Sequence, residues 1–338
     1  MKALFIGGTG NISSSITELA LSRGWEIYLL NRGNSTLPAG AKSIVADINN
    51  EPEAQIAKKL EGMSFDVVAD FVPFTVEHVE RDIRLFKGIT RQYFFISSAS
   101  AYQKPLSRPI VDESTPLANP YWQYSRDKAA CEERLMQEYR KDGFPVTIIR
   151  PSHTYSDLYL PFNLTGKNGS WQVLKRIMDG KPILMPGDGT TFWTLTHAQD
   201  FAVAFVGLMG NIHAIGEAFH ITSDERLTWT QVYECVAAAL NVELKVYPVS
   251  SVYLDRCSKL DILGGLIGDK SQNAIFDNSK IKSVVPEFCA KIRFDQGIRS
   301  TVQYHLDHLE KQIADPEFDA WCDRVIEVLD GAVGEILG

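Results

Sequence analysis

The chain has 338 residues, of which 45% are apolar, and its formal net charge is −8 at pH 7. This composition is typical of a globular protein that is long enough for one or two domains. The negative charge repels phosphate backbones, so nucleic acid is not an expected partner. No apolar run approaches the length of a membrane span, and the first residues form no signal-peptide pattern. We therefore expect a cytoplasmic protein that acts on a small molecule, without a membrane.

Cysteine and histidine usage points away from disulfides and metals. The five cysteines are scattered and form no CxxC pair, and the seven histidines form no HExxH motif. Such a pattern fits a reducing compartment and excludes a recognisable zinc signature. His305 and His308 share one predicted helical face, and we expect both on the surface. No metal site is predicted.

Short apolar runs alternate with amphipathic stretches through the first half of the chain. This alternation is typical of βαβ units, in which helices cover both faces of a parallel sheet. Right-handed crossovers then predict a doubly wound, Rossmann-type α/β fold. The predicted strands are 2–6, 26–30, 43–46, 65–70, 92–97 and 145–149, and the predicted helices are 11–23, 51–61, 75–87 and 121–142.

The pattern changes after Pro151. Residues 156–170 are loop-like, and PGDGT at 186–190 is a turn cluster. We expect a dinucleotide-binding domain over 1–155, with returning elements from about 186–222. Residues 156–338 are expected to form mainly a smaller, discontinuous mixed α/β substrate domain. Its predicted helices are 170–179, 197–209, 228–240, 295–311 and 316–330, and its predicted strands are near 217–221 and 243–247.

The turn after the first strand is nearly a dinucleotide-binding fingerprint. Gly7-Gly8-Thr9-Gly10 joins a strand to a helix, and its glycines let backbone N–H groups approach a pyrophosphate. The third glycine of the fingerprint is Ser13, which affects the packing of helix on strand more than anion binding. A tight turn without a ligand is the alternative. We expect the cofactor to lie against Gly7, Thr9, Gly10, Asn11 and Ile12.

The segment after the second strand bears on the choice of cofactor. It carries no carboxylate for a ribose 2′-hydroxyl and offers Arg32 beside Asn31, which suits a 2′-phosphate. NADP is therefore weakly preferred over NAD. Asp47 and Ile48 follow the next strand and are expected to contact the cofactor, although a helix cap is an alternative role for Asp47.

Three polar residues form a candidate catalytic group. Tyr124 and Lys128 are spaced i,i+4 and so share one helical face. A nearby ammonium stabilises a phenolate and lowers the tyrosine pKa. Ser98 follows a buried strand, at the sheet edge where ligands bind in this fold. Each feature is weak alone, but their order after a glycine turn is specific. A solvated helix face and a simple turn serine are the alternatives.

With these motifs the sequence resembles the extended short-chain dehydrogenase/reductases, also called NAD-dependent epimerase/dehydratases. The resemblance runs over nearly the whole chain and includes SSASAY, VDESTPLANPYWQYSRDK, TIIRPSHTYS and FDNSKIK. It implies that Ser98, Tyr124 and Lys128 are the catalytic triad, and that Tyr124 and Lys128 also contact the cofactor. It further implies cofactor contacts for Phe71, Val72, Ser97, Pro151 and His153, and substrate contacts for Ser100, His153, Asn163 and Trp193.

Two departures from the family pattern concern the substrate. Nucleotide-sugar members usually carry an arginine shortly after the GDG turn, where this chain has Trp193. The usual asparagine after Arg-Pro is replaced, and the stretch is Pro151-Ser152-His153. A diphosphate needs cationic donors, so a nucleotide-sugar substrate follows from the resemblance alone. Core packing is an alternative role for Trp193.

Three functions stay open on this evidence. The first is an epimerase or dehydratase that transfers a hydride at a sugar or nucleotide-sugar hydroxyl or carbonyl. The second is an NADP-dependent ketone or aldehyde reductase. The third is a non-catalytic, nucleotide-regulated protein, because "NRG" and "PSHTY" are also similar to a subgroup that includes chloroplast stem-loop-binding proteins, which are linked to RNA. In the family, helices 75–87 and 121–142 often pair across a homodimer, and this sequence permits that pairing.

Overall fold

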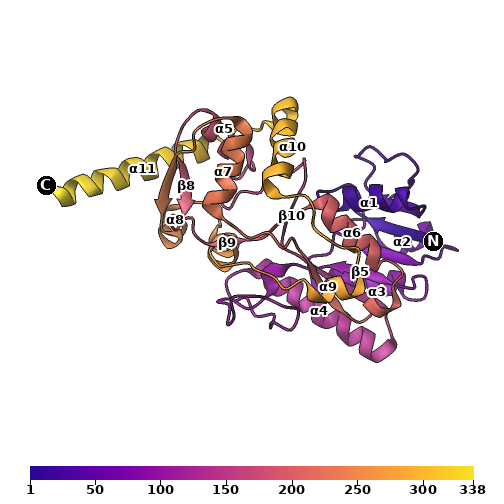
Figure 1. Cartoon of the computed structure of the whole chain (residues 1–338). Coiled ribbons are helices and arrows are strands. Elements are labelled where there is room, and N and C mark those ends of the chain that lie inside the picture. Colours follow the sequence, from indigo (N-terminus) through magenta and orange to yellow (C-terminus); the bar gives the residue numbers. More distant parts are fainter.

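The centre of the molecule is a seven-stranded parallel sheet, seen here in a computed structural model that describes all residues from 1 to 338 (Figure 1). Its strand order, β11-β6-β5-β4-β1-β2-β3, is that of a doubly wound sheet. The predicted fold class is therefore confirmed. The strands are β1 (Lys2–Ile6), β2 (Glu26–Asn31), β3 (Lys42–Val45), β4 (Val67–Asp70), β5 (Tyr93–Ile96), β6 (Val146–Pro151) and β11 (Ala218–Ile221).

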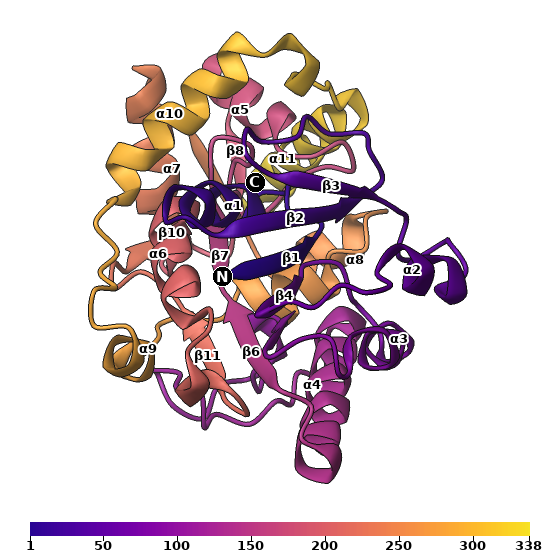
Figure 2. The same cartoon turned by 90° about the vertical axis from the view of Figure 1, so that its right-hand side faces the viewer.

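Both faces of the sheet are buried, which explains why the strands read as continuous apolar runs. In β1, Ala3 and Phe5 point into the core on one face, whereas Leu4 and Ile6 point into the core on the other. Helices α1 (Ser13–Ser22) and α6 (Ala198–Leu208) cover the first face (Figure 2). The second face is covered by α2 (Glu53–Lys59), α3 (Val76–Phe86) and α4 (Gln123–Asp142).

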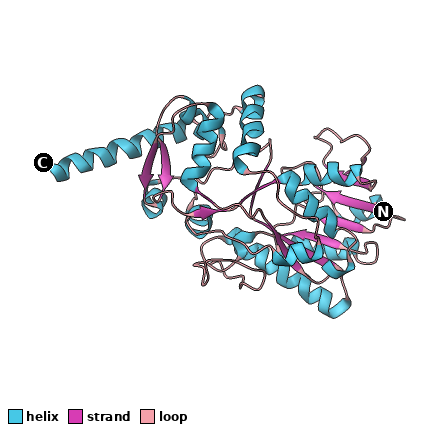
Figure 3. Cartoon of the chain, in the orientation of Figure 1, coloured by secondary structure: helices cyan, strands magenta, loops and turns pink.

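A smaller region packs beyond one edge of this domain around its own core of 32 buried residues. Figure 3 shows that helices dominate it and that its strands are short. The helices are α5 (Trp171–Met178), α7 (Trp229–Leu240), α8 (Ser251–Cys257), α10 (Phe294–Asp307) and α11 (Pro316–Leu337), and the end of α11 projects away from the body (Figure 1). The paired short strands are β8 (Ile183–Pro186) with β13 (Val246–Val249), β9 (Phe192–Trp193) with β12 (Leu227–Thr228), and β7 (His153–Tyr155) with β10 (Leu195–His197).

Two later segments return to the large domain. The first comprises α6 and β11, within the range 186–222 where returning elements are predicted, although β8 and β9 of that range lie toward the small region. The second is α9 (Ser279–Val284), whose Ile281 packs in the core beside α6. This second return is absent from the predicted boundaries, because a six-residue helix leaves little periodic signal.

The histidine prediction is wrong for one residue. His305 is buried, and its Nδ1 lies 2.9 Å from the carbonyl oxygen of Thr301. The apolar face of α10 packs against α7 and so encloses this part of the helix. None of the helices combines the length and the hydrophobicity that a membrane span requires.

Candidate active site

Two cavities open along the carboxyl edge of the sheet. The smaller, of about 280 Å³, lies beyond the ends of β1 to β4, and its wall includes Gly7, Asn31 and Val72. The larger, of about 670 Å³, lies beyond β5 and β6 and extends to the small region. This edge is where ligands bind in doubly wound folds, and it collects most of the predicted site residues.

The glycine turn is tightly packed at the smaller cavity. Gly7 has a φ of +78°, and an added Cβ there would come within 2.8 Å of a methyl group of Val72. At Gly8 an added Cβ would come within 2.6 Å of Leu29. The turn therefore requires glycine. The backbone N–H groups of Asn11 and Ile12, just before α1, have no acceptor within the chain and are free to bind an anion.

Ser13, in place of the third glycine, ties the turn together. Its hydroxyl donates to the carbonyl oxygen of Gly7 at 2.7 Å and accepts from the N–H of Gly10 at 2.8 Å. The Gly10 N–H is therefore already occupied by a hydrogen bond within the turn. The amides of Asn11 and Ile12 that follow have no acceptor within the chain.

Polar groups surround the far side of the smaller cavity. Arg32 is exposed at its wall and forms no ion pair within the chain. Asp47, which also lines it, accepts hydrogen bonds from the N–H groups of Asn49 and Asn50 and from the Asn50 side chain. These bonds lower the pKa of Asp47, and the charge of Arg32 lowers it further. Asp47 thus stabilises a local turn just before α2. This arrangement is similar to the helix-cap role that is its alternative. Thr9 and Ile48 also line this cavity.

Several predicted cofactor contacts have other partners. Asn11 donates from its side chain to the carbonyl oxygen of Thr154 and accepts from Ser156, which ties the glycine turn to the segment after β6. Phe71 packs against Phe5 and so points into the core, away from both cavities. Ser97 is buried with an unpaired hydroxyl, and it lines neither cavity.

Ser98 and Tyr124 both line the larger cavity. Burial raises the pKa of the Tyr124 phenol, the Ser98 hydroxyl lowers it, and the nearby Asp269 carboxylate raises it again. The prediction that an ammonium brings this pKa down is not met, because burial outweighs the polar contacts. The serine and the phenol nevertheless line the same cavity.

Lys128 lies behind the phenol. Its Nζ donates to the carbonyl oxygens of Pro73 (2.6 Å) and Ile96 (2.7 Å), and it sits 5.7 Å from the centre of the Tyr124 ring. Burial lowers the pKa of Lys128 to about 8. The two hydrogen bonds therefore fix the ammonium at the ends of β4 and β5. The lowered pKa means that it loses its proton at a lower pH than an exposed lysine does.

A chain of hydroxyl groups holds Ser98. Its Oγ lies 2.8 Å from that of Ser100, whose Oγ accepts a hydrogen bond from Ser125 at 2.8 Å. The Asn119 side chain donates to the carbonyl oxygen of Ser100 and to that of Gly268, in the π-helical segment Leu263–Lys270. Ser100 lines the cavity as predicted, and Ser125 and Asn119 are positioning residues that the motifs did not indicate.

His153 and Trp193 form the opposite wall of the larger cavity. The indole N–H of Trp193 donates to His153 Nδ1 at 3.1 Å, and His153 Nε2 lies 3.4 Å from the hydroxyl of Tyr159. Because Nδ1 accepts, the neutral ring carries its proton on Nε2. Burial lowers the pKa of His153 well below its usual range. Trp193 is buried and stacks on Trp229, with the ring centres 5.4 Å apart. Because it also lines the larger cavity, core packing and a place in the cavity wall are compatible.

One predicted substrate residue lies elsewhere. Asn163 is buried behind the cavity wall, where its side-chain oxygen accepts from the hydroxyl of Tyr233 at 2.8 Å. The structure does not bring it to the larger cavity. The cavity residues that were not predicted include Trp122 and all three charged residues of the lining, which are Lys104, Asp269 and Lys270.

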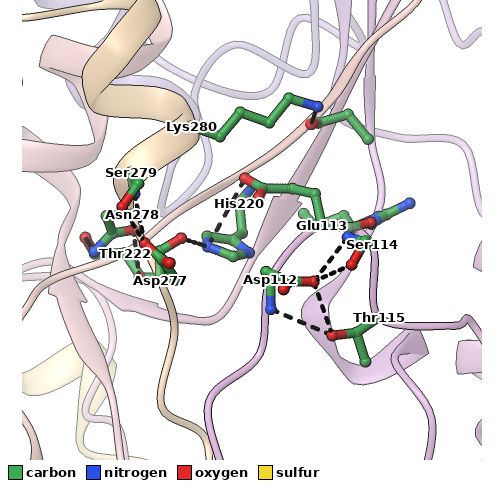
Figure 4. A network of polar contacts seen from close by, with 12 residues as sticks. Asp112, Glu113, Ser114, Thr115, His220, Thr222, Asp277, Asn278, Ser279 and Lys280 are labelled. Atoms are coloured by element: carbon green, nitrogen blue, oxygen red, sulfur yellow. Dashed lines mark hydrogen bonds and ion pairs between the residues drawn. The ribbon is translucent and has the colours of Figure 1, made fainter.

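A buried polar chain fixes the segment that follows Ser98. Arg150 pairs with Glu132 at 2.7 Å and donates to the hydroxyl of Tyr102. Tyr102 lies 3.2 Å from Nδ1 of His220, whose Nε2 reaches the carbonyl oxygen of Asp277 at 2.6 Å. Figure 4 shows His220 between Glu113 and Asp277 in this network. Strands β6 and β11 and the returning segment are thereby joined behind the larger cavity.

A parallel sheet of this order, with a glycine turn after its first strand, defines the class of dinucleotide-binding α/β proteins. Within that class, the chain belongs to the NAD dependent epimerase/dehydratase family, whose family model matches residues 3–222. This result confirms the resemblance inferred from the motifs. The family is one of NAD-dependent enzymes.

Individual proteins agree with this assignment. The chain is 26% identical to 2′-dehydrokanamycin reductase of Streptomyces kanamyceticus over 71% of its length and 67% of that protein. It is 28% identical to the chloroplast stem-loop binding protein of 41 kDa b of Arabidopsis thaliana over 70% of its length and 63% of that protein. The chain thus spans about two thirds of the length of these relatives.

Among solved structures, UDP-glucuronic acid 4-epimerase of Bacillus cereus in complex with NAD superposes with a TM-score of 0.70. The match covers 91% of this chain and 99% of the epimerase, at 16% sequence identity. At that identity the likeness shows a shared fold.

Proposed function

We propose that this chain transfers a hydride between a nicotinamide cofactor and a hydroxyl-bearing or carbonyl carbon of a sugar-like substrate. The observation that carries the proposal is the meeting of Ser98 and Tyr124 at one end of the larger cavity, with Lys128 behind the phenol. These groups come from two separate segments, and a hydroxyl, a phenol and an amine together can hold and move a proton.

The residues of the smaller cavity fit a dinucleotide. The turn at Gly7 and Gly8 has no room for side chains, and the amides of Asn11 and Ile12 are free to bind a pyrophosphate. Asn31, Arg32 and Ile48 would surround the adenosine. When bound, NAD or NADP supplies a hydride acceptor or donor beside the larger cavity.

The residues of the chain have distinct parts in the proposed reaction. Tyr124 takes the proton of the substrate hydroxyl during oxidation and returns it during reduction. Ser98 donates a hydrogen bond to the same oxygen and is held by Ser100. The Lys128 ammonium, 5.7 Å from the centre of the Tyr124 ring, places a positive charge behind the phenol when the proton leaves. Pro151 and His153 line the passage where substrate and cofactor would meet.

NADP is our proposed cofactor in preference to NAD. Support comes from Arg32, an exposed guanidinium at the wall of the smaller cavity without an ion-pair partner. A 2′-phosphate would supply that partner, and the guanidinium binds phosphate through two parallel hydrogen bonds.

Reduction of a ketone is a second candidate, alongside epimerisation or dehydration. It is favoured by the relative named as a reductase, 2′-dehydrokanamycin reductase, and by the Trp193–His153 wall, which offers no guanidinium for a diphosphate. A non-catalytic RNA-associated role has the stem-loop binding relative in its favour, but the net charge of −8 opposes RNA binding.

The test compares Tyr124→Phe with Tyr121→Phe, a matched change at an exposed tyrosine nearby. Each protein is assayed with UDP-glucuronate and NAD⁺, and with a panel of keto sugars and NADPH. We expect Tyr124→Phe to lower turnover of the accepted probe by roughly 10²- to 10⁴-fold, with cofactor affinity within about twofold. The control retains activity.

Equal turnover in Tyr124→Phe and the wild type would remove the proton-transfer role. Stoichiometry then separates the candidates, because a reductase consumes one NADPH per product whereas an epimerase regenerates its cofactor. Failure to bind either dinucleotide would contradict the proposal as a whole.

A further inference from the structure

The larger cavity contains an ammonium group without a partner. Lys104 is 6% exposed, lines the cavity, and its Nζ forms no hydrogen bond or ion pair within the chain. Burial lowers the pKa of Lys104, while Asp269 raises it. The ammonium is not among the fully enclosed polar atoms of the chain and so keeps access to the cavity. An anionic ligand there would supply the partner that the chain does not.

The charges of the cavity wall leave one cation free. Of the 22 lining residues, the only lysines, arginines, aspartates and glutamates are Lys104, Asp269 and Lys270, which carry one net positive charge together. Lys270 lies 3.9 Å from the Asp269 carboxylate and within reach of the carbonyl oxygen of Gly265. Lys270 therefore has partners on the π-helical segment Leu263–Lys270, and Lys104 has none.

Lys104 lies near the proposed reaction centre. It follows the short 3₁₀ turn η1 (Ala99–Ala101), which Ser98 caps. Lys104, Tyr124 and Asp269 all line the larger cavity. A substrate that fills this cavity therefore meets both the phenol and the ammonium.

We propose that Lys104 binds an anionic group of the substrate, a carboxylate or a phosphate, and so selects acidic sugars over neutral and cationic ones. The inference rests on the proposed function, since it takes the cavity to be the substrate site. The cofactor pyrophosphate would also reach this cavity, because Asn11 and Ile12 line it, so the test below uses protein that is already loaded with the cofactor. A single free ammonium suits one carboxylate or phosphate group.

The test measures binding and needs no turnover. NADP-loaded protein is titrated by calorimetry with glucose, glucosamine, glucuronate and glucose 6-phosphate. The variants are Lys104→Met, which keeps the length of the stem, Lys104→Arg, which keeps the charge, and Lys141→Met, a control at an exposed lysine on α4. Thermal unfolding confirms that each variant is folded.

We expect glucuronate or glucose 6-phosphate to bind at least about tenfold more tightly than glucose, and glucosamine to bind most weakly. The stronger of the two acids identifies the anion as carboxylate or phosphate. Lys104→Met abolishes the preference, Lys104→Arg retains part of it, and the control leaves it intact. An unchanged preference in Lys104→Met, tight binding of glucosamine, or no binding of any of the four sugars would overturn the inference. Equal turnover in Tyr124→Phe and the wild type, which would contradict the proposed function, leaves this binding measurement unaffected, so the two proposals fail separately.

Discussion

The indole N–H of Trp193 donates a 3.1 Å hydrogen bond to Nδ1 of His153, and these are the two positions at which the chain departs from the nucleotide-sugar pattern. An arginine and an asparagine are expected there, and an aromatic pair occupies both places. The two changes are therefore coupled in space, because the proton donor at one position satisfies the acceptor at the other. These two side chains present aromatic surface to the larger cavity and carry no guanidinium.

Replacement of Trp193 by phenylalanine tests this coupling. The variant keeps an aromatic ring but leaves His153 Nδ1 without a donor, which costs about 1–3 kcal/mol if the site stays buried. We expect the histidine to lose its preference for the Nε2–H form and its pKa to rise, since the lost bond favoured the neutral ring. ¹⁵N NMR titration of the histidines measures both. Trp321→Phe on α11 is the control, and an unchanged His153 signal would contradict the coupling.

Replacement of Arg32 by glutamine tests the cofactor preference. We expect the dissociation constant for NADPH to rise roughly ten- to a hundredfold, because a charge-assisted bond to the 2′-phosphate is worth about 1.5–3 kcal/mol. Affinity for NADH should change by less than about threefold. Fluorescence titration with both cofactors gives the ratio, and Arg23→Gln at the exposed end of α1 is the control. Tighter NADH binding by the wild-type protein would count against the preference.

Activity should fall at alkaline pH. The pKa of Lys128 is lowered to about 8 by burial, so its ammonium is present below that pH and is lost above it. Because the role proposed for Lys128 requires its charged form, kcat/KM should decline as the pH rises through about 8. In Lys128→Arg the charge persists, and the alkaline decline should move upward by at least about one pH unit. A decline at the same pH in both proteins would assign it to another group.

The buried Arg150–Glu132 pair should matter for stability. Both side chains are almost fully buried and meet at 2.7 Å. Glu132→Gln leaves the guanidinium charge uncompensated, and the free energy of unfolding should fall by about 3–5 kcal/mol. Urea denaturation measures the change. Glu133→Gln, at an exposed position on the same helix, should stay within about 0.5 kcal/mol of the wild type.

Local sequence patterns predicted most of the large domain. The strands from β1 to β6 are apolar on both faces, and their alternation with amphipathic helices determines a doubly wound sheet. Gly7 and Gly8 marked the nucleotide turn, because only glycine satisfies its backbone and packing. The spacing of Tyr124 and Lys128 placed both on one face of α4, as a helical repeat requires.

Long-range contacts decided the rest. In the sequence, Ser13 occupies the position of the third fingerprint glycine. Only the folded turn shows that its hydroxyl bridges Gly7 and Gly10. Asn163 faces the core because it accepts a hydrogen bond from Tyr233, and Phe71 does so because it packs against Phe5. Both partners lie on distant elements. Lys104 and Asp269 are 165 positions apart, so no local spacing predicts that both line the same cavity. Sequence periodicity reports which face of an element is buried, whereas the composition of a cavity depends on how distant elements pack, and only the tertiary structure determines that.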